Sequence, residues 1–175
     1  MTKKDFVKKY KPFALESEKK TGISHLFTLA QAALESGWGE RGVGNNFFGI
    51  KLPKNLVSNT PKEKKQLLFT TEVLNSPTPN PQQFPKIISI SKRTDGKWLY
   101  RVQDWFRKYN TPEECFTDHA EFFFRNKRYA KALLVKADPY KFAEEVAKAG
   151  YATATNYADS LKKLIKKIEE NDSRI

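Results

Sequence analysis

Glu35 is the residue whose surroundings in this sequence best suit acid–base chemistry. The run Ile23–Leu34 leaves no continuous polar face and predicts a helix buried on nearly all sides. Gly37 is expected to cap this helix, which places Glu35 in its last turn. Burial and the negative end of the helix dipole both disfavour a carboxylate, so Glu35 should hold a proton near neutral pH, as a general acid must. Alternatively, Glu35 binds a backbone amide or an arginine inside the fold. Trp38 either packs beside Glu35 and raises the pKa of its carboxyl group, or fills the core.

Cys115 and His119 lie one helical turn apart and suggest a cysteine nucleophile with its base. Cys115 is followed by Phe116 within a predicted helix, so we expect a small buried hydrophobe there. Asp118 beside His119 suggests a charge relay, but no motif places a serine or cysteine nucleophile next to the pair. His119 is therefore expected to have a structural hydrogen-bonding role. With one cysteine and two histidines, the sequence predicts no disulfide, no metal site and no cofactor.

The glycine- and asparagine-rich segment after the predicted helix reads as a loop. Asn45 and Asn46 could hydrogen-bond to sugar hydroxyl or acetamido groups, and Phe47 and Phe48 could pack on a pyranose ring. Alternatively, the asparagines satisfy the turn and the phenylalanines fill the core. We expect a mixed arrangement, in which Asn46 and one phenylalanine face a cleft.

The elements that must position these groups follow from periodicity and caps. Further helices are predicted from Thr2 to about Gly22, from Thr111 to about Asn126, from Asp138 to Gly150 and from about Asn156 onward. Strands are predicted at Leu67–Val73, Ile87–Ser91 and Trp98–Val102, with a hairpin turn at Asp95-Gly96 and a proline-rich loop at 75–81. Only residues 171–175 are expected to fray. The pattern predicts an α+β fold in a single domain, residues 1–175, with a small antiparallel β-lobe at about 66–105.

Composition and charge limit the kinds of binding partner that this chain is expected to have. The chain has 175 residues and a net charge of +12, which predicts attraction to polyanions. Its lysines are dispersed and lack the arginine-rich aromatic pattern of an RNA-reading segment, so no nucleic-acid partner is expected. Since no apolar run approaches the roughly 20 residues that span a bilayer, membrane insertion is not expected either. The start, Met1 to Asp5, has no apolar signal core.

Several motifs in a fixed order resemble a known family. They are Ala30-Gln31-Ala32-Ala33-Leu34-Glu35-Ser36-Gly37-Trp38-Gly39, Gly44-Asn45-Asn46-Phe47-Phe48-Gly49-Ile50-Lys51, Phe106-Arg107-Lys108-Tyr109, Asp118-His119 and Gly150-Tyr151-Ala152-Thr153. Together they resemble the bacterial glucosaminidases of glycoside hydrolase family 73, which include flagellar muramidase-like domains, autolysins and phage lysins. The resemblance runs from about Thr2 to Ile168. It implies a lysozyme-like fold with a cleft between helical body and β-lobe, and hydrolysis of the β-1,4 bond after N-acetylglucosamine in peptidoglycan.

The resemblance also implies roles for individual residues. Glu35 matches the family's general acid, Glu72 resembles its second acid, and Tyr151 matches a tyrosine that faces the acid. This chain has Ala154 where the family often has an aspartate, and it departs most in the proline-rich loop after Glu72. The expected substrate-binding residues are Trp38, Asn45, Asn46, Phe47, Phe48, Gly49 and Lys51.

Three mechanisms and three functions remain open at this stage. Carboxyl groups about 6.5–9.5 Å apart would favour inversion and about 5–5.5 Å retention, whereas the substrate's acetamido group could act as nucleophile instead. The functional alternatives are a muramidase or lytic transglycosylase on the same fold, and a non-catalytic module that binds cell-wall polyanions. The expected partner is the peptidoglycan glycan strand, and the protein is expected to be a monomer. We expect synthesis in the cytoplasm and action on the cell wall, as a phage lysin, a delivered effector or a secreted domain without its leader.

Overall fold

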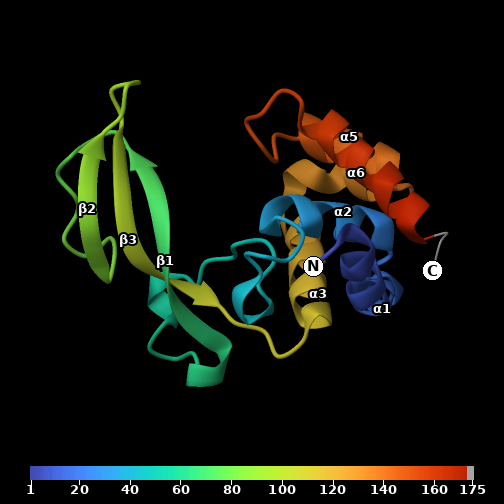
Figure 1. Ribbon diagram of the computed structural model, residues 1–175, viewed down its shortest axis with the longest axis horizontal. Coiled ribbons are helices and arrows are strands. Elements are labelled where there is room, and N and C mark those ends of the chain that lie inside the picture. Colours follow the sequence, from blue (N-terminus) through green and yellow to red (C-terminus); the bar gives the residue numbers. More distant parts are fainter. Residues whose placement is uncertain (173–175) are drawn as a thin grey trace. The chain divides into compact units, whose positions relative to one another are not determined.

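The computed structural model describes residues 1–172. The chain forms two compact units: one combines Met1–Gly49 with the segment from Tyr109 onward, and the other is the continuous segment Ile50–Lys108 (Figure 1). The second unit contains the predicted β-lobe but begins earlier in the sequence.

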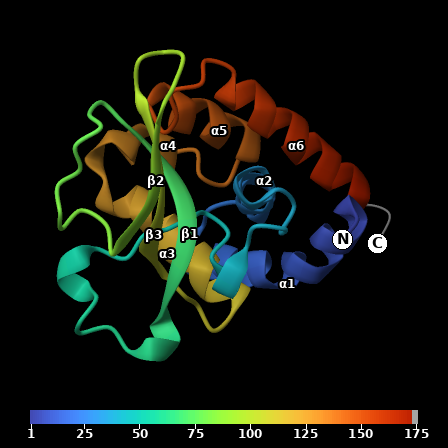
Figure 2. The same ribbon diagram turned by 60° about the vertical axis from the view of Figure 1, so that its left-hand side comes forward.

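The first unit is helical, and α2 lies at its centre. Its elements are α1 (Lys3–Thr21), α2 (His25–Ser36), η1 (Val43–Asn45), α3 (Pro112–Arg125), η4 (Lys127–Tyr129), α4 (Ala130–Leu133), α5 (Pro139–Lys148) and α6 (Tyr157–Asp172). Helix α2 packs against α1, α5 and α6, and Figure 2 shows it almost end-on with α1 and α6 beside it. The predicted burial of this helix on nearly all sides is confirmed, since residues from Phe27 to Ala33 are all buried.

Helix ends in this unit follow their local signals. Thr2 and Asp5 form a capping box at the start of α1, and Gly22 ends that helix with a φ of 78°. The side chain of Thr111 accepts the amide of Glu114 at the start of α3. The short elements η4 and α4 were not predicted. Helix α6 includes residues 171 and 172, while residues 173–175 lie outside the described part of the chain.

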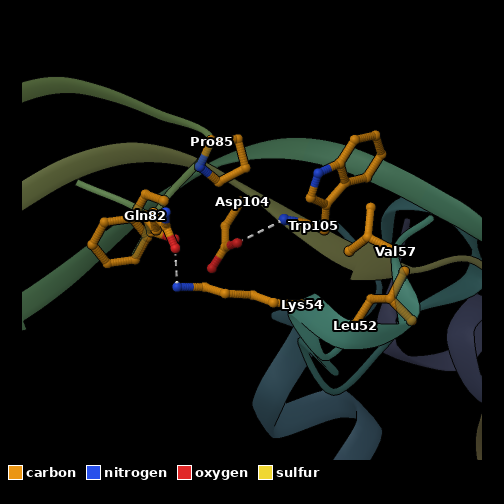
Figure 3. A pocket seen from close by; sticks show the side chains of 8 residues that line it. Leu52, Lys54, Val57, Gln82, Pro85, Asp104 and Trp105 are labelled. Carbon is orange, nitrogen blue, oxygen red and sulfur yellow. Dashed lines mark hydrogen bonds between the residues drawn. The ribbon is translucent and has the colours of Figure 1, made fainter. Parts of the chain in front are cut away.

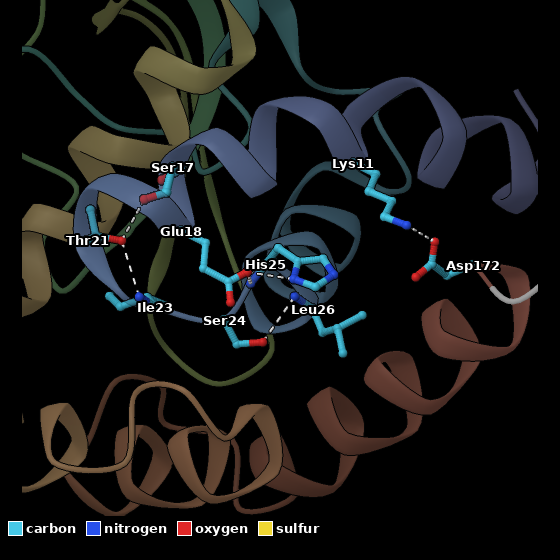
Figure 4. A network of polar contacts seen from close by, with 9 residues as sticks. All are labelled: Lys11, Ser17, Glu18, Thr21, Ile23, Ser24, His25, Leu26 and Asp172. Carbon is cyan, nitrogen blue, oxygen red and sulfur yellow. Dashed lines mark hydrogen bonds and ion pairs between the residues drawn. The ribbon is translucent and has the colours of Figure 1, made fainter. Parts of the chain in front are cut away.

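Polar contacts join α1 to α2 and α6, two of the helices that pack against it (Figure 4). Glu18 accepts the backbone amide of His25 at 3.1 Å and contacts the ring Nδ1 of the same residue at 2.7 Å. Lys11 pairs with Asp172 of α6 at 2.5 Å. These contacts fix the first turn of α2 and the last turn of α6 against one helix.

The second unit is an antiparallel sheet with strand order β1-β3-β2. Its elements are η2 (Lys54–Leu56), η3 (Lys62–Lys64), β1 (Lys65–Leu74), β2 (Lys86–Lys92) and β3 (Trp98–Arg107). Tyr100, Val102 and Phe84 form a small core on one face, while Phe69 on the other face is 70% exposed. The three strands, the hairpin at Gly96 and the strand-free proline-rich loop are confirmed.

One strand boundary was wrong. Strand β3 continues past the predicted end at Val102 to Arg107, where it pairs with Lys65 of β1. Gln103 and Asp104 interrupt the apolar pattern, but they pair in register with Phe69 and Leu68 and extend the ladder. Residue 51 also forms an isolated bridge with Phe106, which attaches the start of this unit to the end of its central strand.

Candidate active site

Glu35 lies in the last turn of α2, held by a tightly bonded helix end. Gly37 caps the helix in the left-handed region with a φ of 59°, and Trp38 follows with a φ of 56°. The Trp38 amide donates to the carbonyl of Ala33 at 2.8 Å. The Ser36 hydroxyl donates to Ala32 O at 2.5 Å and accepts the Gly39 amide at 2.8 Å. These bonds satisfy groups that a helix end leaves unpaired and hold the backbone around Glu35 in place.

The surroundings of Glu35 favour its protonated form. Burial raises the pKa of its carboxyl group, and the Tyr157 hydroxyl bond and the Arg41 charge only partly oppose this shift. The Tyr157 hydroxyl donates to Glu35 Oε1 at 3.4 Å. Arg41 Nη2 reaches the backbone carbonyl of Glu35, also at 3.4 Å, rather than forming an ion pair with its carboxylate. The pKa of this half-buried carboxyl group is therefore shifted in the direction that favours a general acid.

Two tyrosines close to Glu35 stay protonated. The rings of Tyr151 and Tyr157 stack with centroids 5.5 Å apart. Burial is the main cause that raises the pKa of both phenols, and the nearby Glu35 charge raises them further. Both residues are therefore neutral hydrogen-bonding groups near neutral pH. The first unit thus places the Tyr151 phenol close enough to Glu35 for the carboxylate charge to affect it.

No functional role was predicted for Gln31 or Tyr157, yet both belong to this cluster. Gln31 is fully buried and donates from Nε2 to the Tyr157 hydroxyl oxygen at 3.0 Å. His119 Nε2 lies 2.7 Å from Gln31 Oε1 and 3.3 Å from the Tyr151 hydroxyl. A glutamine in the middle of an otherwise apolar run was the available signal, because a buried amide requires polar partners.

His119 and Cys115 take the roles expected from the sequence. Burial lowers the pKa of His119 to about 3, so the ring is neutral and acts through hydrogen bonds. Cys115 is fully buried in the aromatic core, and burial raises the pKa of its thiol to about 12. The thiol is therefore a packing group and not a nucleophile.

Phe47 and Phe48 diverge within the loop after α2. Phe47 is 2% exposed and packs on Tyr10 and Phe116, with ring centroids 4.9 and 5.4 Å away. The expectation that Phe47 binds substrate is therefore corrected: it is a core residue. Phe48 is partly exposed and stacks on His119 at 3.9 Å, so it is the member of the pair that solvent can reach.

The remaining candidates in this unit divide between structure and surface. Asn45 donates from Nδ2 to the Tyr109 carbonyl at 3.1 Å and so supports the loop. Asn46 is buried, whereas we expected it to face a cleft. Gly49 is exposed, with a φ of 62°. Trp38 is half-buried, packing edge-on against Phe6 at 5.4 Å, so it contributes to the core and keeps a solvent-accessible part.

In the second unit, Glu72 belongs to a charge cluster with Lys51 and Asp104. Lys51 Nζ contacts Glu72 Oε1 and lies 3.3 Å from Asp104 Oδ2. Burial alone would lower the pKa of the Lys51 ammonium, but the two carboxylates outweigh it and raise that pKa. The side chain of Glu72 is 27% exposed. To act on water, Glu72 must exchange or share its contact with Lys51.

Asp104 was missed in the sequence, although its position carried a signal. Along β3, Tyr100, Val102 and Phe106 occupy the buried face, and Asp104 takes the same alternation while only 8% exposed. Its Oδ1 accepts the Trp105 amide at 2.8 Å. A carboxylate on the apolar face of a strand requires such partners.

A hollow of about 350 Å³ lies beside Asp104 in the same unit (Figure 3). Lys54 stretches across it and donates to the Gln82 carbonyl at 2.8 Å. It is lined by Leu52, Lys54, Val57, Gln82, Phe84, Pro85, Asp104 and Trp105.

Within residues 1–172, no group of three or more histidine, cysteine, aspartate or glutamate side chains is placed to hold a metal ion. No helix in the described part of the chain combines the length and apolarity that crossing a bilayer demands.

Known proteins resemble this chain over most of its length. The peptidoglycan hydrolase FlgJ of Vibrio parahaemolyticus is 32% identical over 170 residues, which cover 94% of this chain and 47% of that protein. The exo-glucosaminidase LytG of Bacillus subtilis is 30% identical over 149 residues, covering 81% of this chain and 43% of that protein. The chain thus spans less than half the length of these two curated relatives.

The solved glycoside hydrolase domain of Salmonella typhimurium FlgJ superposes with a TM-score of 0.69 and 27% identity, covering 99% of this chain and 92% of that one. This likeness confirms the predicted lysozyme-like α+β fold. Residues 11–170 match the family described as "Mannosyl-glycoprotein endo-beta-N-acetylglucosaminidase", and the chain therefore belongs to this glucosaminidase family.

Proposed function

We propose that this protein is a peptidoglycan hydrolase that cleaves the β-1,4 bond following N-acetylglucosamine, with Glu35 as the general acid. The observation that carries the proposal is the half-buried carboxyl group of Glu35, whose pKa is raised by burial at the end of an apolar helix. Its setting in a glucosaminidase-family chain supports the substrate class, because relatives bear the names peptidoglycan hydrolase and exo-glucosaminidase.

Glycoside cleavage requires a proton on the leaving oxygen and stabilisation of an oxocarbenium-like centre. Protonated Glu35 supplies the first. Tyr151, a neutral phenol beside the acid, supplies a hydroxyl group and a ring that would stabilise the charged intermediate.

Glu72 is our candidate for the second carboxyl group, either as the base that activates water or as the residue that orients the substrate's acetamido group. Its partner Lys51 then has a positioning role, since the ammonium contacts both Glu72 and Asp104. In a substrate-assisted reaction the rate depends on the acetamido group. A substrate lacking that group would be cleaved at a normal rate only if Glu72 acts directly.

The decisive experiment is mass spectrometry of borohydride-reduced muropeptides, after digestion of purified peptidoglycan with the wild type and with Glu35→Gln. We expect reduced N-acetylglucosamine ends from the wild type alone. Reduced muramic acid or 1,6-anhydro ends would assign the protein to the muramidases or lytic transglycosylases. Equal activity of Glu35→Gln would remove Glu35 from the mechanism, and no new ends from either protein would leave a wall-binding module.

We further propose that the protein works as a monomer and that its net charge of +12 speeds its encounter with anionic wall polymers. Binding to cell walls should then weaken as salt rises. Analytical ultracentrifugation and wall pull-down at two ionic strengths test these two statements separately.

A further inference from the structure

Three side chains from three helices lead to Glu35 through consecutive polar contacts. His119 of α3 contacts Gln31 of α2 at 2.7 Å, and Gln31 donates to Tyr157 of α6 at 3.0 Å. The Tyr157 hydroxyl then donates to Glu35 Oε1 at 3.4 Å. His119, Gln31 and Tyr157 are all buried, so the first two contacts are shielded from water.

The chemistry of each group sets the direction of the hydrogen bonds. An amide oxygen only accepts, so the neutral ring of His119 must carry its proton on Nε2, facing Gln31 Oε1. The opposite end of the Gln31 amide donates to the hydroxyl oxygen of Tyr157. Because a phenol has one proton, and Gln31 occupies a lone pair of its oxygen, that proton is free to point at Glu35.

We propose that His119 and Gln31 are positioning residues that aim the Tyr157 hydroxyl at Glu35 Oε1, so that Oε2 becomes the oxygen carrying the catalytic proton. The inference rests on the proposed function. The hydroxyl bond occupies one carboxyl oxygen and leaves the other for the leaving group. After proton transfer the same bond stabilises the carboxylate that remains, which favours the reaction.

Few other groups titrate around Glu35 in this unit. Arg41 adjoins it from the segment after α2, Tyr151 from the loop after α5, and Tyr157 from α6. Arginine stays charged, and the pKa values of the two phenols are raised above their usual range. His119 stays neutral because its pKa is lowered to about 3. Between about pH 4 and 9 the titration of this cluster is thus that of Glu35.

The first test is Tyr157→Phe, which keeps the ring stacked on Tyr151 and removes only the hydroxyl group. Tyr129→Phe is the matched control, since the Tyr129 hydroxyl is buried without a hydrogen-bond partner among the described residues. The pKa of Glu35 is measured by carbon NMR of glutamate-labelled protein, and the pH dependence of kcat/KM is measured on peptidoglycan.

In Tyr157→Phe we expect both the NMR pKa of Glu35 and the alkaline limb of the rate profile to move up by about 0.5–1 pH unit. The plateau rate should fall by roughly fivefold. Tyr129→Phe should leave the pKa and the limb in place. An unchanged Glu35 pKa in Tyr157→Phe, with the fold intact by circular dichroism, overturns the proposal.

The second test is Gln31→Met, which keeps the length of the side chain and removes both amide contacts. Tyr157 then keeps its hydroxyl but loses the group that aims it, so the pKa of Glu35 should rise in the same direction by a smaller amount. No shift would show that Tyr157 orients itself, which overturns the role of Gln31 and His119. The NMR pKa of Glu35 is measured without substrate. It can therefore disprove the positioning role of His119 and Gln31 independently of whether the protein hydrolyses peptidoglycan.

Discussion

Phe47 and Phe48 are adjacent in sequence but have different surroundings, and exchanging each for leucine separates packing from recognition. Phe47 is 2% exposed and makes two aromatic contacts, with Tyr10 at 4.9 Å and with Phe116 at 5.4 Å. Each such ring pair contributes about 0.5–1.5 kcal/mol beyond the area that it buries. Phe47→Leu should therefore lower the free energy of unfolding by about 1–3 kcal/mol. Alanine would cost about 3–5 kcal/mol, a large part of a total of about 5–15 kcal/mol, so leucine is the usable variant.

The assay is urea denaturation at pH 7, followed by circular dichroism and fluorescence, together with KM on soluble peptidoglycan fragments. Phe47→Leu should shift the midpoint at constant slope and leave KM unchanged. Phe48→Leu, which loses a partly exposed stack on His119, should shift the midpoint less and raise KM. A stable Phe47→Leu variant with a raised KM would refute this reasoning, because it would place Phe47 at the substrate.

Two further predictions concern charge. Glu35 has a folded pKa above its unfolded value, so stability falls as pH rises from the unfolded pKa through the folded one, and Glu35→Gln removes that loss. In urea denaturation, the free energy of unfolding of Glu35→Gln should therefore equal that of the wild type at pH 4 and exceed it at pH 8 by up to about 1 kcal/mol. A variant less stable than the wild type at pH 8 would contradict the raised pKa of Glu35. Lys51→Met leaves Glu72 and Asp104 without their shared cation and should destabilise the protein by about 1–2 kcal/mol. Adding Asp104→Asn should recover part of the loss in the same assay, and no recovery would argue against the shared contact.

The helix ends could be predicted because their signals are local. Thr2 and Gly22 bound α1, and Gly37 ends α2, through hydrogen bonds within a few residues of each position. The burial of Glu35 followed from the apolar run before it, since a helix without a polar face must be enclosed. The runs Leu67–Val73 and Ile87–Ser91, bounded by turn residues, located β1 and β2.

The rest depended on contacts between distant parts of the chain. Gln31 and Tyr157 are far apart in sequence, and nothing near either residue indicates that they meet. Phe47 and Phe48 are chemically identical, so contacts with distant residues, Tyr10 on α1 and Phe116 on α3, decide which one enters the core. Asp104 made the second half of β3 look unlike a strand, because a charged residue is not expected on its buried face. The charge is balanced by Lys51, which lies on a segment outside the strands.

The split of the first unit into two chain segments has a consequence for how the protein is made. Helix α2 is synthesised before its neighbours α5 and α6, with the whole second unit between them in the sequence. The continuous second unit can complete its sheet from its own residues while α2 still lacks that cover. Until Tyr157 has been added, Glu35 lacks the hydroxyl bond to its Oε1, and α6 cannot yet cover α2. The complete hydrogen-bonded setting of Glu35 can therefore form only after translation has passed the start of α6.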